Sequence, residues 1–252
     1  GQVRVRERKS GEGGMAGVVA MSVMRPAVAA LESKNQLHLR SMVNRGGHFK
    51  HFSYGSHKIA VKSVHLSDDM SSLAMGCNYT NNSSGKGHVL MFDVASVCLR
   101  HMWEQDKQVW AVRFSPDAKI LAASGYTMAL DLYSTTTFEL LQQIKYTPRG
   151  GPAFVWSLEW SRDGSRLVLG NWNGDAFLYQ VHSNEGEETL KLISTVTRTD
   201  RVYTVAINAN GRKILVGGRD KKVGMYSTDV GGPRDKPSSF GKPAEPEKLE
   251  AQ

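Results

Sequence analysis

Residues 109–117 read VWAVRFSPD, and three related stretches recur along the chain. They are VKSVHLSDD at 61–69, VWSLEWSRDG at 155–164 and VYTVAINANG at 202–211. Their starts lie 48, 46 and 47 residues apart. A nearly constant spacing in this range is typical of repeat architectures, in which each unit buries its apolar face against its neighbours because it cannot do so alone.

Each unit predicts four short strands. In the first strand, Val112 and Phe114 flank polar Arg113, which is the alternation of a half-buried strand. A turn follows, and Ser-Pro-Asp or Arg-Asp-Gly suits it because Pro fixes φ, Asp bonds to its own backbone and Gly takes positive φ. The third strand ends in an aromatic residue in all four units, and fourth strands are predicted at 98–104, 138–146 and 190–198.

These features resemble the WD40-repeat family, whose units are four-stranded blades of a β-propeller. The resemblance covers roughly residues 58–229 and rests on the period, the Ser-Pro-Asp turn and the Leu-Ala-x-Gly end of the second strand. The chain lacks a Trp-Asp dipeptide, the nearest being Phe92-Asp93, and only Ser56-His57 stands near the position of the usual Gly-His pair. We therefore predict an all-β, WD40-like β-propeller with four recognisable blades.

The predicted organisation has three parts: a basic, largely irregular leader at 1–35, blades at 36–230, and a disordered tail rich in Pro, Gly and charge at 231–252. Residues 37–43 and 48–54 alternate and predict the last two strands of a blade whose first half is missing. The strand near 49–54 also suggests ring closure by pairing with the last three strands. The alternative, which we favour, is an open or incomplete ring belonging to a longer repeat protein or completed by a second chain, with association through its open sheet edges.

The leader leaves two interpretations open. Residues 15–24 are apolar, Arg25-Pro26 interrupts them, and Ala27-Val28-Ala29 resembles a cleavage site, so Met15–Ala30 is compatible with a signal or transit peptide. We favour an irregular segment or part of an earlier blade. Cys77 and Cys98 form no disulfide framework, which favours a reducing, cytoplasmic location. No apolar stretch reaches the roughly 20 residues that span a bilayer.

The net charge of +8 is unevenly distributed. Residues 1–56 hold nine Lys or Arg against three Glu, whereas residues 57–230 hold nineteen cations against seventeen carboxylates. The repeats are thus nearly neutral. The basic leader is best interpreted as a solvated segment, and we expect no nucleic-acid partner.

Motifs for catalysis, cofactors or metals are missing from the sequence. It contains no Gly-rich phosphate loop, His-Glu-x-x-His, Cys-x-x-Cys or Gly-x-Ser-x-Gly. His48 and His51 would point to opposite faces of one strand, which disfavours a metal site. Asp68 and Asp69 could form a carboxylate pair, but the matching turns of other units carry Asp117 and Asp163, so turn chemistry accounts for all of them. We predict no enzyme activity, no cofactor and no metal.

Candidate binding residues lie on the predicted surface. Trp110, Trp156 and Tyr203 share one register, directly after the first Val of their strands. They are expected near the central channel and its rim, either anchoring a partner peptide or, somewhat more in keeping with the pattern, packing between blades. Trp172 and Arg219 fall at predicted turn tips and are the better-exposed candidates.

The first unit carries an insertion at 78–87, between its second and third strands. Such a loop either carries specific contacts or is a tolerated insertion. It contains glycosylation sequons at Asn78, Asn81 and Asn82, which matter only in a secreted protein.

The resemblance implies a non-catalytic scaffold that docks other proteins or peptides. The alternatives are a regulatory propeller module of a larger multidomain protein, or an enzyme built on a propeller. The enzyme would require several carboxylates or histidines converging on the central channel.

Overall fold

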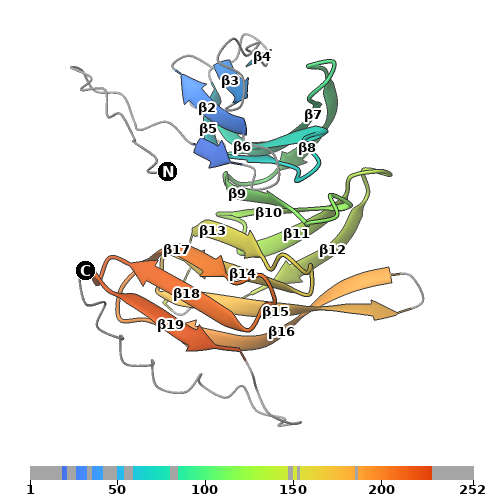
Figure 1. Cartoon of the computed structure of the whole chain (residues 1–252). Helices are drawn as coiled ribbons and strands as arrows, with labels where there is room; N and C mark the ends of the chain where they lie inside the picture. Colours follow the sequence, from blue (N-terminus) through green and yellow to red (C-terminus); the bar gives the residue numbers. More distant parts are fainter. Residues whose placement is uncertain are drawn as a thin grey trace, which may run out of the picture.

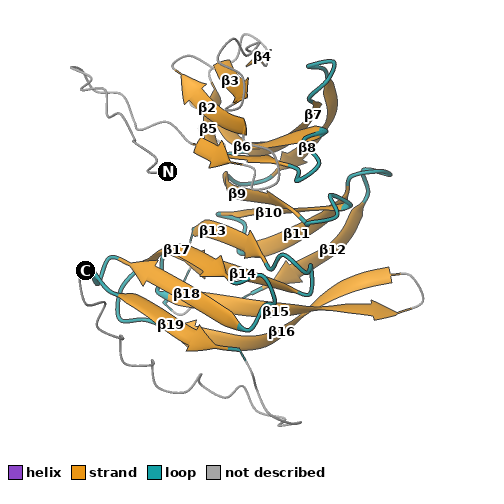
Figure 2. Ribbon diagram, in the orientation of Figure 1, coloured by secondary structure: helices purple, strands orange, loops and turns teal. Residues whose placement is uncertain are grey.

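The computed structural model describes residues 19–21, 27–32, 36–41, 50–53, 59–79, 85–146, 150–151, 154–184 and 187–228. These residues form strands joined by turns and short connections, without a helix (Figure 2). Nineteen strands assemble into five antiparallel sheets. The predicted all-β fold is confirmed.

Chain order and sheet order coincide, because each sheet takes consecutive strands and pairs them in sequence. The first sheet contains β1 (Val19–Met21), β2 (Ala27–Glu32), β3 (Gln36–Ser41) and β4 (Lys50–Ser53). The second contains β5 (Ile59–Leu66), β6 (Ser72–Tyr79), β7 (Gly87–Asp93) and β8 (Leu99–Gln105), and the third contains β9 (Val109–Phe114), β10 (Ile120–Gly125), β11 (Ala129–Ser134) and β12 (Leu140–Lys145). The fourth contains β13 (Val155–Trp160), β14 (Arg166–Asn171), β15 (Asp175–Asn184) and β16 (Glu187–Thr197), and the fifth contains β17 (Val202–Ile207), β18 (Lys213–Gly218) and β19 (Val223–Ser227).

The five sheets form an open arc. Successive first strands contact one another, from β1 to β5, β9, β13 and β17, and the remaining strands of each sheet extend outward from this inner edge (Figure 1). The first and last sheets lie at opposite ends of the arc in Figure 1. This arrangement is that of propeller blades in a ring that does not close.

The first sheet corrects one sequence prediction. Residues 37–43 and 48–54 were expected to form the second half of a blade whose first half is missing, but β1 and β2 pair with each other and β2 pairs with β3. The half-blade interpretation is therefore wrong, because β1 and β2 supply the first half. Ala27, Val28 and Ala29, considered above as a cleavage site, lie in β2.

The suggested ring closure is also wrong. The strand near residues 49–54 is β4, which pairs with β3 in the first sheet and not with the last three strands. Among the described strands, β19 has only β18 as a neighbour. The predicted tail at 231–252 lies outside the described residues.

The turns between first and second strands follow the predicted chemistry. In the third sheet, the Ser115 hydroxyl donates to Asp117 at 2.6 Å and accepts from the backbone N–H of Ile120 at 3.0 Å. The second and fourth sheets repeat the same pair of bonds through Ser67 and Ser161. These bonds close the turn locally, which explains why Asp recurs there.

The hydrophobic core lies mainly between sheets. Val202 and Val205 of β17 pack against Val168 and Leu178 of the fourth sheet, for example. The approach is so close that a Cβ added at Gly170 would lie 2.5 Å from Val202 Cγ1. A similar contact joins the second and third sheets, so a small residue at this point lets neighbouring blades stack.

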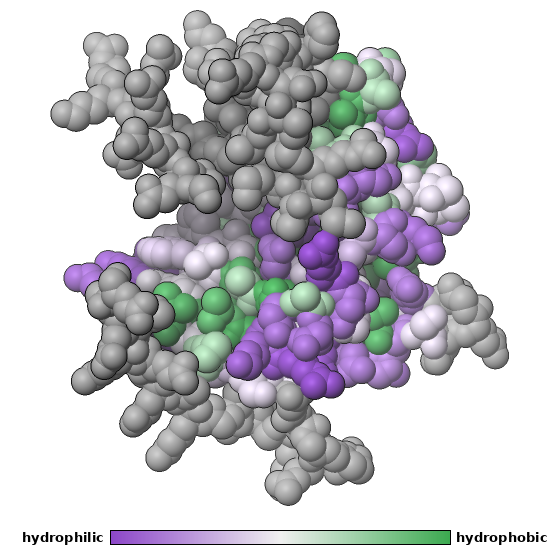
Figure 3. All heavy atoms as spheres, viewed as in Figure 1, coloured by the Kyte–Doolittle hydropathy of each residue, from purple (hydrophilic) through white to green (hydrophobic). Residues whose placement is uncertain are grey.

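The last sheet leaves its stacking face uncovered. Leu215, Val223 and Met225 are 42%, 73% and 41% exposed. The residues in the same register of the three preceding sheets are 0–1% exposed, namely Ala74, Val89 and Met91; Ala122, Leu130 and Leu132; and Val168, Ala176 and Leu178. Apolar side chains accordingly gather over β17–β19 in Figure 3. This terminal face has the character of an interface between blades.

No helix within the described part of the chain is long and apolar enough to cross a membrane.

Candidate functional site

A β-bulge near the start of the first strand in the second to fifth sheets positions the candidate residues. In β13, Val155 pairs with Asn171 and Ser157 pairs with Gly170, so Trp156 is an extra residue without an opposite partner. The same irregularity singles out Lys62 in β5, Trp110 in β9 and Tyr203 in β17. A bulge bends the strand and redirects the extra side chain. The shared register noted in the sequence is therefore a series of bulge residues.

These bulges lie at the same end of the sheets as the turns between second and third strands, because paired strands run antiparallel. Trp172 lies in the turn between β14 and β15, and Phe154 directly precedes β13. Several connections thus bring aromatic side chains to one end of neighbouring blades.

Six aromatic side chains from the third, fourth and fifth sheets make a continuous cluster, which we call the aromatic rim: Trp110, Tyr126, Phe154, Trp156, Trp172 and Tyr203. Trp156 is at its centre. Its ring centroid lies 4.8 Å from that of Trp110, 5.5 Å from that of Trp172 and 5.9 Å from that of Tyr203. Such pairs contribute about 0.5–1.5 kcal/mol each beyond area burial. The rim consequently joins three blades.

The rim is only partly covered. Tyr126 and Tyr203 are 36% and 42% exposed, and the three tryptophans are half-buried. Trp172 is therefore less exposed than the turn-tip prediction suggests. Partner binding and packing between blades were predicted as alternatives. In the structure these side chains contact one another across blades and also remain at the surface.

Two of the chain's own cations lie against the rim. The Lys62 ammonium is 4.7 Å from the Trp110 ring centroid, and the Arg201 guanidinium is 3.4 Å from that of Trp172. Both are cation–π contacts, worth about 0.5–2 kcal/mol depending on exposure. Each covers one face of a tryptophan ring.

Arg219 lies apart from the ring contacts. It occupies the predicted turn between β18 and β19, is exposed, and its Nε is 3.9 Å from the Asp200 carboxylate. The structure thus brings four of the five candidates into one cluster and leaves Arg219 beside it.

Phe154, Tyr126 and Arg201 were missed by the sequence prediction. They belong to connections whose length varies between units, so the repeat alignment gave them no common register. Their aromatic or cationic character was the only available signal.

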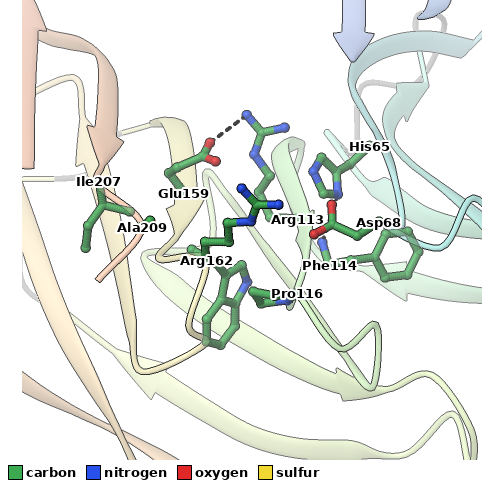
Figure 4. A pocket seen from close by; sticks show the side chains of 10 residues that line it. His65, Asp68, Arg113, Phe114, Pro116, Glu159, Arg162, Ile207 and Ala209 are labelled. Carbon is green, nitrogen blue, oxygen red and sulfur yellow. Dashed lines mark hydrogen bonds and ion pairs between the residues drawn. The ribbon is translucent and has the colours of Figure 1, made fainter. Parts of the chain in front are cut away.

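A second feature lies at the opposite ends of the first strands. A cavity of about 240 Å³ is lined by residues of four blades, among them His65, Arg113, Glu159 and Trp160. Figure 4 shows Arg113 reaching from β9 to Glu159 of β13, with His65 and Asp68 alongside. The Arg113 Nη2 to Glu159 Oε2 distance is 2.9 Å, and Arg113 Nε donates to the Leu158 carbonyl oxygen at 2.9 Å.

Burial shifts the pKa values of two side chains that line this cavity. It raises the pKa of Glu159, and the Arg113 charge offsets only part of that effect. Burial, assisted by the Arg113 charge, holds the pKa of His65 well below 6.5. The neutral His65 ring accepts a hydrogen bond at Nδ1 from the Phe114 backbone N–H at 3.1 Å. These polar groups link consecutive first strands.

Other sequence candidates are placed as follows. Asn78 is buried and its Oδ1 accepts from the Val109 N–H at 2.8 Å, so its side chain is not available to a glycan; Asn81 and Asn82 lie outside the described residues. His48 also lies outside them. In the side chains that the structure describes, no group of three His, Cys, Asp or Glu is arranged to hold a metal ion.

The family model for the WD domain, G-beta repeat, matches residues 96–130 and 190–227. The chain thus contains two segments that match the WD40 repeat. Each matched segment begins near the outer strand of one sheet and continues into the next, from β8 to β11 and from β16 to β19. A WD40 repeat along the sequence therefore spans the boundary between two blades, which couples their positions covalently.

Three proteins are similar in sequence to parts of the chain. It is 22% identical over 181 residues to WD repeat-containing protein SL1-17 of Schistosoma mansoni, covering 71% of this chain. It is 27% identical over 111 residues to WD repeat-containing protein VIP3 of Arabidopsis thaliana and 34% identical over 89 residues to Actin-interacting protein 1 of Drosophila melanogaster, covering 40% and 33% of this chain. The matches span 54%, 35% and 14% of those proteins, so the chain corresponds to about half or less of each relative's length.

Proposed function

We propose that this chain is a non-catalytic WD40 scaffold that docks another protein or peptide on its aromatic rim. The family relationship supports a protein-interaction role in general. The rim itself carries the specific proposal, because it is a partly exposed cluster of tryptophan and tyrosine with Arg219 at its border. Trp, Tyr and Arg are the residues most enriched in binding hot spots.

A propeller-based enzyme is the alternative, and the polar cavity is the observation that favours it. His65, Asp68 and Glu159 meet the requirement for converging ionisable groups. However, Glu159 is ion-paired with Arg113, His65 Nδ1 is occupied by the Phe114 N–H, and the cavity lining contains no Ser, Cys or Lys nucleophile. These engagements between blades support a structural role for the cavity.

The test is affinity capture with immobilised native chain and with a Trp172→Ala/Arg219→Ala variant. We expect the affinity of captured partners for the variant to fall roughly 30-fold or more, which corresponds to about 2 kcal/mol of binding free energy. Leu140→Ala/Leu141→Ala on the outer strand β12 is the matched control, since both residues are exposed and distant in register from the rim. Equal capture by the native chain and the rim variant would refute docking on this face.

We also propose a reducing, cytoplasmic location. Cys77 and Cys98 are free cysteines, and burial raises the pKa of the Cys77 thiol to about 12, which keeps it protonated and unreactive. Fluorescence microscopy of the tagged full-length protein tests this, and secretion of the tagged protein would contradict it.

A further inference from the structure

The last two connections beside the rim carry more positive than negative charge. Residues 198–203 and 219–222 contain five Lys or Arg and two Asp. Arg201 of the first range lies against Trp172, and Tyr203 at its end contacts Trp156, so both ranges adjoin the rim. A partner on the rim therefore meets this charge.

Both carboxylates in these connections already have partners. Asp220 forms an ion pair with Arg198 in which both side chains are about nine-tenths buried, with Arg198 Nε to Asp220 Oδ2 at 3.0 Å. Asp200 accepts the Arg201 backbone N–H at 2.8 Å and lies 3.9 Å from Arg219. The two carboxylates therefore serve five cations, which leaves an excess of three positive charges, and Arg219 is paired only at 3.9 Å with Asp200.

The contacts already made by the aromatic ring faces of the rim also limit which kind of partner can bind there. Aromatic sites that bind cationic side chains, and platforms that stack nucleic-acid bases, both need open ring faces. Here Lys62 already covers a face of Trp110 and Arg201 covers a face of Trp172, while Trp156 is stacked against Trp172 at an interplanar angle of 19°. A basic partner would also be repelled by these same cations.

We infer that the aromatic rim binds an acidic polypeptide segment, whose Asp or Glu side chains pair with Arg201, Arg219 and Lys222 while an apolar side chain packs against Trp156, Trp172 and Tyr203. This inference rests on the proposed docking function and specifies its partner. The rim supplies the buried apolar contact, which contributes most of the affinity. The flanking cations favour a negatively charged partner, which contributes specificity.

The experiment is selection of a displayed library of random dodecapeptides on the full chain. Peptides whose retention is lost with the Trp172→Ala variant define rim binders. We expect rim binders to be enriched in Asp and Glu over Lys and Arg, and their affinity to fall about tenfold or more in an Arg201→Glu/Arg219→Glu variant, since two attractive pairs become repulsive. Selection on that variant should yield basic peptides instead.

Lys191→Glu/Lys213→Glu is the matched control because it makes the same change in net charge at exposed positions away from the rim; it should leave the selected composition unchanged. Rim binders without acidic enrichment would overturn the acidic partner while leaving docking intact. A single-stranded oligonucleotide that binds the native chain but not Trp172→Ala would overturn it in favour of nucleic acid. If no selected peptide depends on Trp172, the docking function itself fails.

Discussion

The guanidinium of Arg201 lies 3.4 Å from the ring centroid of Trp172. This contact joins the connection before β17 to the turn after β14, and so links the fourth and fifth sheets at the rim. Trp172 thereby contributes to stability as well as to the proposed binding surface.

We expect Trp172→Ala to lower the free energy of unfolding by about 1–2 kcal/mol, because it removes the Arg201 contact and the stacked pair with Trp156. Arg219→Ala should change it by no more than about 0.5 kcal/mol, as for an ordinary surface site. Chemical denaturation monitored by circular dichroism measures both. Trp156→Ala should cost the most of the three, since Trp156 contacts three other rings; an equal cost for all three variants would contradict a cluster centred on Trp156.

Close stacking of blades predicts losses of stability of different size at two equivalent glycines. At Gly170 an added Cβ would lie 2.5 Å and 2.9 Å from Val202 and Val205, so Gly170→Ala should destabilise by about 1–3 kcal/mol through overpacking. At Gly217 the nearest atom is the Thr204 Cγ2 at 3.0 Å, on an exposed side chain that can rotate away, so Gly217→Ala should cost no more than about 0.5 kcal/mol. Differential scanning calorimetry compares them. Similar losses at both positions would show that stacking does not determine the effect.

His65 predicts a pH-dependent stability. Its pKa is depressed in the folded state, so the unfolded chain binds a proton that the folded chain does not as the pH falls below about 6.5. The stability associated with neutral His65 is fully present above that pH and is lost progressively below it. Between about pH 6.5 and 5.5 the loss should approach 1 kcal/mol, measured by urea denaturation.

The matched variant is His65→Asn, whose amide oxygen can accept from the Phe114 N–H but does not titrate in this range. We expect it to remove the corresponding slope, after subtraction from the native profile. His65→Ala should lose both the slope and the hydrogen bond, and so be less stable at neutral pH. Identical pH profiles for the native chain and His65→Asn would show that His65 is not the responsible group.

The terminal face predicts concentration-dependent self-association of this chain. Replacing Leu215, Val223 and Met225 with Thr should shift sedimentation velocity profiles towards monomer, because it removes the exposed apolar surface without disturbing a buried core. Leu140→Thr/Leu141→Thr makes the same chemical change on the outer strand β12 and should have less effect. If this control reduces association more than the terminal-face variant, contact through outer strands is the dominant mode.

The repeat period was sufficient to predict the blades from 59 to 227, because strand alternation and turn residues act locally. The first two strands of the N-terminal sheet were not assigned, since their segment was interpreted as irregular or as part of an earlier blade. Residues 19–32 lack the turn sequence that marks the other units, and their apolar composition also suited a targeting segment. Pairing between β2 and β3 is what makes them strands, and pairing is a tertiary property.

Part of the candidate site, like part of the fold, could be predicted from the sequence. A common register indicated that Trp110, Trp156 and Tyr203 are equivalent, but the bulge that redirects them depends on the neighbouring strand. The partnership of Arg201 with Trp172, and of Arg113 with Glu159, joins residues of different units. The sequence pattern repeats within each unit, so it does not predict contacts between residues of different units.

The bulge near the start of β5, β9, β13 and β17 gives four of the blades one residue that has no partner on the neighbouring strand. These residues are a lysine (Lys62), two tryptophans (Trp110 and Trp156) and a tyrosine (Tyr203), yet the pairing around them is the same. Substitution at these positions can therefore alter recognition without changing how strands register. In evolutionary terms, a change of side chain at these four positions can change which partner is bound while the strand pairing of the blades is conserved.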